Sequence, residues 1–91
     1  MVAEIYTRTF CGYCFLVKNI LKNKNISFLE INLDIEPDKM EEMTIRSKGR
    51  ASVPQVFISG FHVGGHSELS ILEKNGGLEC VSQDKNFGRN G

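Results

Sequence analysis

The spacing of hydrophobic residues in the first third of the chain predicts a strand, a helix and a second strand. β-Branched and aromatic residues indicate a strand over residues 2–6. Hydrophobic residues recur at helical spacing between polar ones and predict an amphipathic helix over residues 12–24. Strict alternation of hydrophobic and polar residues predicts a strand over 29–33. This order makes a βαβ unit, which is normally parallel and right-handed.

The middle of the chain predicts a second helix and a hairpin. Pro37 suits the first turn of a helix that extends to Lys48, because a missing N–H costs nothing there. Segments 55–58 and 61–63 are mostly hydrophobic, and Ser59-Gly60 between them is typical of a tight turn. We therefore expect these two segments to pair as antiparallel strands.

A last helix completes the predicted fold. Ser67 is the expected N-cap of a helix that ends at residues 75–77. The order βαβαββα is typical of an α/β sandwich, with helices on both faces of a four-stranded mixed sheet. The length suits one compact domain over residues 1–91, in which 81–91 are expected to form a loosely ordered tail.

Charge and hydropathy limit the classes of function. The chain has 11 basic and 11 acidic residues, so no overall field would gather nucleic acid or an anionic membrane. No stretch approaches the ~20 apolar residues of a membrane span, and the N-terminus lacks a signal-peptide pattern. We therefore expect a cytoplasmic protein. Two of the three cysteines are separated by only two residues, which in such a protein indicates redox chemistry or metal binding.

The closely spaced cysteines lie where the first strand leads into the first helix. A helix N-terminus stabilises a thiolate through its dipole and free N–H groups, so Cys11 is the expected nucleophile. Cys14 follows one turn later, where it can resolve a mixed disulfide formed at Cys11. Arg8 adds a positive charge that could assist the thiolate or hold an anion, or that is simply a solvated surface charge.

A zinc site is the structural alternative for the cysteine pair. Such a site needs four ligands, usually as two closely spaced pairs. The further candidates are Cys80, His62 and His66, which show no paired spacing. A metal is therefore not expected, and we assign Cys80 no catalytic role.

Two other segments are candidates for ligand binding. Val53-Pro54 precedes an expected strand, and extended backbone there could pair with a peptide-like ligand. Gly64-Gly65 leads into the last helix, where free N–H groups could receive a carboxylate. A tight turn followed by a helix cap would give the same local pattern.

Taken together, these motifs give the chain a resemblance to the glutaredoxin family from Val2 to about Gly77. The family's order and spacing are matched by residues 4–8, 11–14, 52–58 and 64–69. The resemblance implies a thioredoxin-like fold with at least three helices around the sheet. It also implies a cis peptide bond before Pro54 and a groove that binds glutathione.

The resemblance further implies roles for single residues. Cys11 would bond the glutathione sulfur, and Tyr13 would form one wall of the groove. Arg8 stands where the family usually has lysine, near the glycine carboxylate of glutathione. Val53 would pair with the cysteinyl part, and the N–H groups of His66 and Ser67 would bind the γ-glutamyl carboxylate. The expected glutathione-binding residues are Arg8, Tyr13, Val53, Pro54, His66 and Ser67.

The predicted function is therefore a glutathione-dependent thiol-disulfide oxidoreductase, with glutathione as its co-substrate. Its expected substrates are glutathione mixed disulfides and protein disulfides, and it is expected to act as a monomer without nucleic acid or membrane partners. Gly12 leaves an alternative open, because many family members have proline there. Some members without that proline bind a two-iron iron-sulfur cluster between two protomers. The alternative is a dimeric cluster carrier or sensor, with Cys11 and glutathione as ligands.

Overall fold

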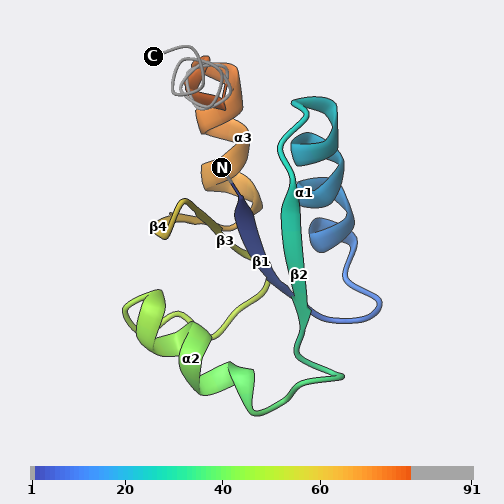
Figure 1. Ribbon diagram of the computed structural model, residues 1–91, viewed down its shortest axis with the longest axis vertical. Coiled ribbons are helices and arrows are strands. Elements are labelled where there is room, and N and C mark those ends of the chain that lie inside the picture. The colour runs from blue at the N-terminus through green and yellow to red at the C-terminus, as the bar shows by residue number, and fades with distance from the viewer. Residues whose placement is uncertain (1, 79–91) are drawn as a thin grey trace.

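The computed structural model describes residues 2–78, which form a mixed sheet of four strands with three helices (Figure 1). The strand order across the sheet is β2-β1-β3-β4, and only β1 and β2 are parallel among these neighbours. The predicted α/β fold is thereby confirmed, whereas Cys80 and the expected tail lie outside the described residues. The strands are β1 (Ala3–Thr7), β2 (Phe28–Asn32), β3 (Gln55–Ile58) and β4 (Phe61–Gly64), and the helices are α1 (Gly12–Asn23), α2 (Lys39–Arg46) and α3 (His66–Lys74).

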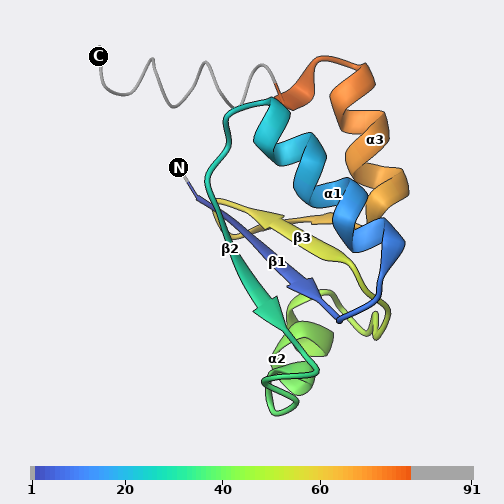
Figure 2. The ribbon, with the colours of Figure 1, turned by 90° about the vertical axis from the view of Figure 1, so that its right-hand side faces the viewer.

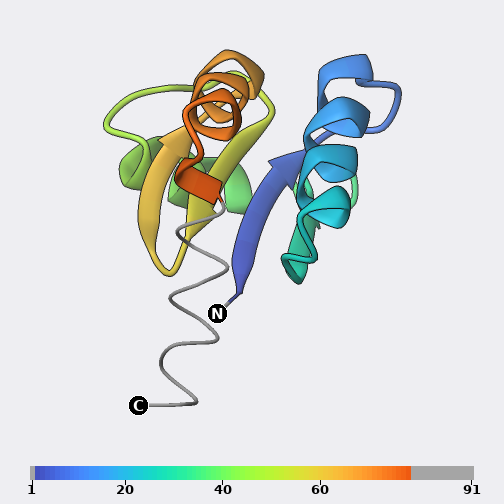
Figure 3. The same ribbon diagram turned by 90° about the horizontal axis from the view of Figure 1, so that it is seen from above.

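Helices cover both faces of the sheet, as the sequence predicts. Figures 2 and 3 show α1 and α3 beside one another on one face, with α2 on the other. Neighbouring residues of a strand point to opposite faces of the sheet. β1 therefore contributes side chains to the hydrophobic core on each face. Ala3 and Ile5 pack towards α1 and α3, whereas Tyr6 and Phe57 pack towards Met43 of α2. None of the helices within residues 2–78 is long and apolar enough to cross a membrane.

The predicted hairpin is present between β3 and β4. Ser59 and Gly60 both have positive φ, at 52° and 85°, as a tight hairpin turn with primed geometry requires. The pairing of the two strands contains an irregularity at Val56/Phe57. The hairpin places Gln55 at the start of β3, next to the loop that will line the candidate site.

Helix α2 is shorter than predicted at both ends. Residues 37–38 form a turn, and the helix begins at Lys39. At its C-terminal end Lys48 and Gly49 adopt positive φ, which a continuing helix does not allow. The N–H of Gly49 instead donates to the carbonyl of Thr44 at 2.8 Å and closes the helix end.

One further prediction needs correction. Ser67 is not the N-cap of α3, because Gly65 occupies that position and Ser67 lies in the first turn. Glu68 folds back to accept the Gly65 N–H at 2.6 Å, so its side chain satisfies the helix start. Leu29 is 57% exposed, although it lies two residues before the buried Ile31 and therefore on the same face of β2.

Candidate active site

Cys11 occupies the N-cap of α1, directly after the turn that follows β1. Its backbone is extended (φ −119°, ψ 108°), which aims the side chain back over the first turn of the helix. The N–H of Cys14 donates to Cys11 Sγ over 3.3 Å. A sulfur in this position faces the free N–H groups of the first turn and the positive end of the helix dipole.

Cys14 has the opposite environment. Its side chain is buried, and this burial together with its hydrogen bond to Cys11 raises the pKa of the thiol to about 12. A backbone hydrogen bond with Arg8 and the charge of Lys18 act in the other direction but are weaker. The Cys14 thiol is therefore protonated at neutral pH, whereas the half-buried Cys11 is the cysteine that a substrate can reach.

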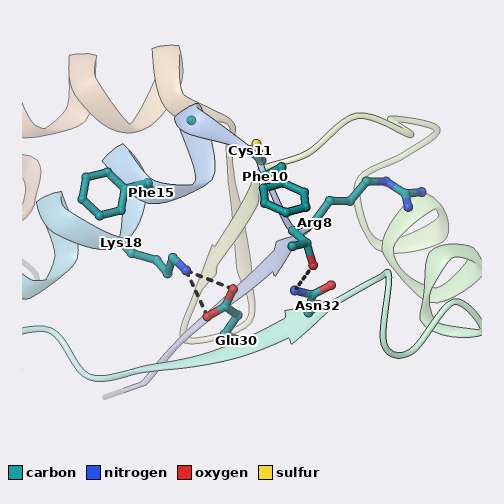
Figure 4. Close-up of a pocket in the computed structure, with 9 residues that line it drawn as sticks. Arg8, Phe10, Cys11, Phe15, Lys18, Glu30 and Asn32 are labelled. Carbon is teal, nitrogen blue, oxygen red and sulfur yellow. Dashed lines mark hydrogen bonds and ion pairs between the residues drawn. The ribbon is translucent and has the colours of Figure 1, made fainter.

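A pocket of about 460 Å³ opens on one side of Cys11 (Figure 4). The aromatic rings of Phe10 and Phe15 stand at its rim, and Phe10 is fully exposed. Inside, the Lys18 ammonium lies 3.1 Å from the Glu30 carboxylate. The complete lining is Arg8, Thr9, Phe10, Cys11, Gly12, Phe15, Lys18, Glu30 and Asn32.

Arg8 borders this pocket but turns its guanidinium away from Cys11 (Figure 4). It forms an ion pair with Asp34 at 2.9 Å, and the backbone N–H of Thr9 donates to the same carboxylate at 2.8 Å. The Thr9 N–H and the Arg8 guanidinium lower the pKa of Asp34 below its ordinary value. Both side chains of the ion pair are more than two-fifths exposed, so the pair can open at little cost.

A second pocket, of about 310 Å³, brings together five of the six residues predicted to bind glutathione. Tyr13 forms one side, with its ring centroid 5.1 Å from that of His66. The loop before β3 forms another side, and its Val53-Pro54 bond is cis, as the family resemblance implies. Arg8 does not line this pocket. The predicted residues that do are Tyr13, Val53, Pro54, His66 and Ser67.

The second pocket also contains polar residues that were not among the predicted glutathione-binding residues. Arg50 and Glu68 lie opposite one another with 3.5 Å between guanidinium and carboxylate, and Ser52 lies beside them. Glu68 stands three residues after the N-cap, a capping-box spacing that was available in the sequence. Arg50 gives no such signal, because its place depends on how the loop between α2 and β3 folds.

The structure gives no direct support for a metal at this site. Among residues 2–78, no three His, Cys, Asp or Glu side chains converge to hold a metal ion. A cluster shared between two copies of the chain would take one protein ligand, Cys11, from each, so that alternative stays a prediction.

The geometry defines a class of protein. A cysteine at a helix N-cap, a buried cysteine one turn later and a cis-proline loop beside them form the dithiol centre of a thioredoxin-like fold. The sequence matches the glutaredoxin family model over residues 3–63. This chain therefore belongs to the glutaredoxin family, whose members are generally thiol oxidoreductases.

Individual relatives agree with this assignment. Glutaredoxin 3 of Escherichia coli strain K12 is 46% identical over 76 residues, which cover 84% of this chain and 90% of that protein. The holo form of glutaredoxin C1 from Populus tremula x tremuloides superposes with a TM-score of 0.79 at 28% identity, over 90% of this chain and 76% of its own. A buckwheat glutaredoxin-glutathione complex gives a TM-score of 0.78 at 27% identity, with coverages of 90% and 76%. The family resemblance and the thioredoxin-like fold are thus confirmed.

Proposed function

We propose that this protein is a glutathione-dependent thiol-disulfide oxidoreductase that reduces glutathione mixed disulfides and protein disulfides in the cytoplasm. The observation that carries the proposal is the contrast between the two cysteines. Cys11 is accessible at a helix N-terminus, whereas Cys14 is buried with a pKa of about 12. One is suited to attack a substrate, and the other to act only after a mixed disulfide has formed.

With a glutathione mixed disulfide as substrate, the Cys11 thiolate attacks the glutathione sulfur. A bond forms between that sulfur and Cys11 Sγ, the substrate's sulfur–sulfur bond breaks, and the leaving thiolate takes a proton from water. The thiolate of a second glutathione then attacks the glutathione sulfur held on Cys11. Oxidised glutathione leaves, and the Cys11 thiolate is restored, so Cys14 is not required in this route.

With a protein disulfide as substrate, Cys11 first becomes linked to one substrate sulfur and the other leaves as a thiolate. Cys14 then loses its proton and attacks Cys11 Sγ, which releases the reduced protein and leaves a Cys11–Cys14 disulfide. Two glutathione molecules reduce that disulfide in turn. Because the Cys14 thiol is buried and protonated at neutral pH, it cannot compete with Cys11 for the first attack.

The second pocket is the proposed glutathione site. Glutathione is the ligand of the buckwheat relative, and here the pocket combines an aromatic wall, the cis-proline loop and a helix N-terminus. Tyr13 would flank the tripeptide, Val53 would pair with its cysteinyl backbone, and the first N–H groups of α3 would face its γ-glutamyl carboxylate. Arg8 would reach the glycine carboxylate after leaving Asp34, which the weak exposed ion pair allows.

Replacing each cysteine in turn tests the function and the two roles. We expect Cys11→Ser to abolish glutathione-coupled reduction of a small glutathione mixed disulfide, because a serine hydroxyl is a far poorer nucleophile at neutral pH. Cys14→Ser should keep that activity and lose most turnover of a protein disulfide. Both rates can be measured with glutathione and glutathione reductase as the electron supply. Turnover retained in Cys11→Ser would contradict the proposal.

A further inference from the structure

Gln55 is a fully buried polar residue that none of the roles above uses. It begins β3, directly after the loop of residues 50–54 that lines the second pocket. Its amide nitrogen lies 3.1 Å from the carbonyl oxygen and 3.3 Å from the hydroxyl oxygen of Ser52. Its amide oxygen lies 2.7 Å from Nε2 of His62 on β4. A buried amide with all these contacts is fixed in place, because losing any of them would leave a polar atom unpaired.

The contacts of Gln55 determine which way its amide faces and which proton His62 carries. A backbone carbonyl can only accept a hydrogen bond, so the NH₂ group of Gln55 must face Ser52. The Gln55 oxygen therefore faces His62, and only an Nε2–H can donate to it. The result is a directed chain of hydrogen bonds from His62 through Gln55 to Ser52.

The two ends of this chain have different surroundings. His62 is an exposed residue, and its ring packs on that of Phe57 with centroids 4.9 Å apart. Ser52 lines the second pocket beside Val53, Pro54 and Arg50. The chain thus connects a side chain on the surface of the hairpin to the loop that would contact glutathione.

We propose that His62 and Gln55 are positioning residues for glutathione recognition. They hold the backbone of the 52–54 loop at the spacing that Val53 needs to pair with the cysteinyl part of the tripeptide. This inference rests on the proposed function, and it adds two residues that do not touch the ligand. Cys11 is held by a different element, α1. We therefore expect the hydrogen bonds from His62 through Gln55 to Ser52 to affect glutathione binding and to leave the chemical step unchanged.

The test is the kinetics of His62→Leu on a small glutathione mixed disulfide. We expect KM to rise about three- to tenfold with kcat unchanged, because the unpaired Gln55 oxygen lets the loop move. His62→Gln supplies an amide N–H in the same direction and should restore KM to near the wild-type value. Gln55→Met removes all the hydrogen bonds that link His62, Gln55 and Ser52 without changing the side-chain volume much. The KM of this variant should rise at least as far as that of His62→Leu. Phe61→Ala is the matched control on β4, since that exposed side chain belongs to neither pocket, and its KM should stay at the wild-type value.

A second readout does not depend on turnover. Amide hydrogen exchange at residues 52–55 should be faster in His62→Leu than in wild type and in Phe61→Ala. An unchanged KM in His62→Leu overturns the proposal whatever the exchange shows, and so does a KM that His62→Gln fails to restore. Wild-type protein that does not turn over glutathione mixed disulfides would reject the proposed function itself, and that outcome is recognised before any variant is compared.

Discussion

The two cysteines show how far the position of a residue determines its chemistry. Cys11 and Cys14 are one helical turn apart, yet the first receives an N–H on its sulfur and the second is enclosed by the core. An N–H pointing at sulfur stabilises negative charge there, whereas an apolar environment opposes it. In the proposed mechanism, the role of Cys11 as the attacking cysteine and of Cys14 as the resolving cysteine follows from these two environments.

Gly64, at the end of β4 next to the candidate site, is required both by its backbone conformation and by the side chain of Glu68. Gly64 has φ +122°, and a Cβ there would lie 2.6 Å from Glu68 Oε1 and 2.9 Å from Glu68 Cβ. We expect Gly64→Ala to lower the free energy of unfolding by about 2–3 kcal/mol, from backbone strain and from displacement of the carboxylate that caps α3. Urea denaturation monitored by circular dichroism measures the loss.

Gly49→Ala is the control for that experiment. Gly49 also has positive φ, at +102°, but a Cβ at this position would meet nothing within 4 Å, so only backbone strain of about 1 kcal/mol is expected. Equal losses for Gly49→Ala and Gly64→Ala would show that Glu68 imposes no steric requirement at Gly64.

The residues of the candidate site could be predicted from the sequence to different degrees. The spacing of Cys11 and Cys14 predicted their positions at the start of the first helix and one turn inside it, because a strand-to-helix junction has only one helix N-terminus. Arg50 was missed, since a charged residue in a loop carries no periodic signal. Arg8 was expected near the ligand, and its ion pair with Asp34 depends on a contact between separate loops that no local pattern reveals.

At the scale of whole elements, α2 is attached to the sheet by polar contacts as well as by its hydrophobic face. Arg46 lies 2.8 Å from both Glu4 and the Tyr6 hydroxyl, and its guanidinium stacks 4.1 Å from the centre of the Phe57 ring. The Tyr6 hydroxyl also donates to Glu42. Burial and that hydrogen bond raise the pKa of Tyr6 to about 12, so the phenol remains a donor at neutral pH. These contacts join α2 to the centre of the sheet.

Replacing Arg46 should therefore weaken the whole domain. We expect Arg46→Ala to lower the free energy of unfolding by about 1–3 kcal/mol, because it removes three charge-assisted hydrogen bonds, two to Glu4 and one to Tyr6, together with the cation–π contacts. Lys39→Ala, which breaks an exposed ion pair with Glu42 at 3.6 Å, should cost at most about 0.5 kcal/mol. Denaturant unfolding of both variants makes the comparison, and an Arg46→Ala loss no larger than that of Lys39→Ala would contradict it.

The sequence predicted every element of residues 2–78 but not all of their limits. Periodicity identifies an element because burial imposes it, which is why α1 and the β3–β4 hairpin were placed well. Helix ends depend on single side chains and on backbone angles, which periodicity does not show. Ser67 was therefore predicted as the N-cap of the last helix, whereas the N-cap is Gly65, whose N–H donates to Glu68. The exposure of Leu29 could not be foreseen, because the alternation that places it on the same face as the buried Ile31 does not show how far that face is covered.

For the whole molecule, the active site and the core are coupled through Cys14. Its sulfur is buried below Cys11 at the start of α1, and the same helix supplies Val17 and Leu21 to the core beneath α3. A charge on the Cys14 sulfur would therefore have to be accommodated in the folded interior. In the unfolded chain the same thiol is in water and ionises near 9.

This coupling predicts how stability depends on pH. The folded protein retains the Cys14 proton up to a pKa of about 12, whereas the unfolded chain releases it near 9.0. The stabilising effect of the buried neutral thiol is therefore fully present below pH 9 and is lost as the pH rises from 9 towards 12. We expect the stability of wild type relative to Cys14→Ala to be constant from pH 7 to 8.5 and to fall above pH 9. The slope should approach about 1.4 kcal/mol per pH unit.

Comparison with Cys14→Ala is needed because Tyr6 also has a raised pKa and titrates in the same range in both proteins. Urea unfolding under a phosphine reductant, at intervals from pH 7 to 10.5, keeps both cysteines reduced while the difference is measured. A stability difference that stays flat across pH 9 would mean that the folded protein admits the Cys14 thiolate. In that event Cys14 could compete with Cys11 for substrates, and the division of roles between the two cysteines would have to rest on accessibility alone.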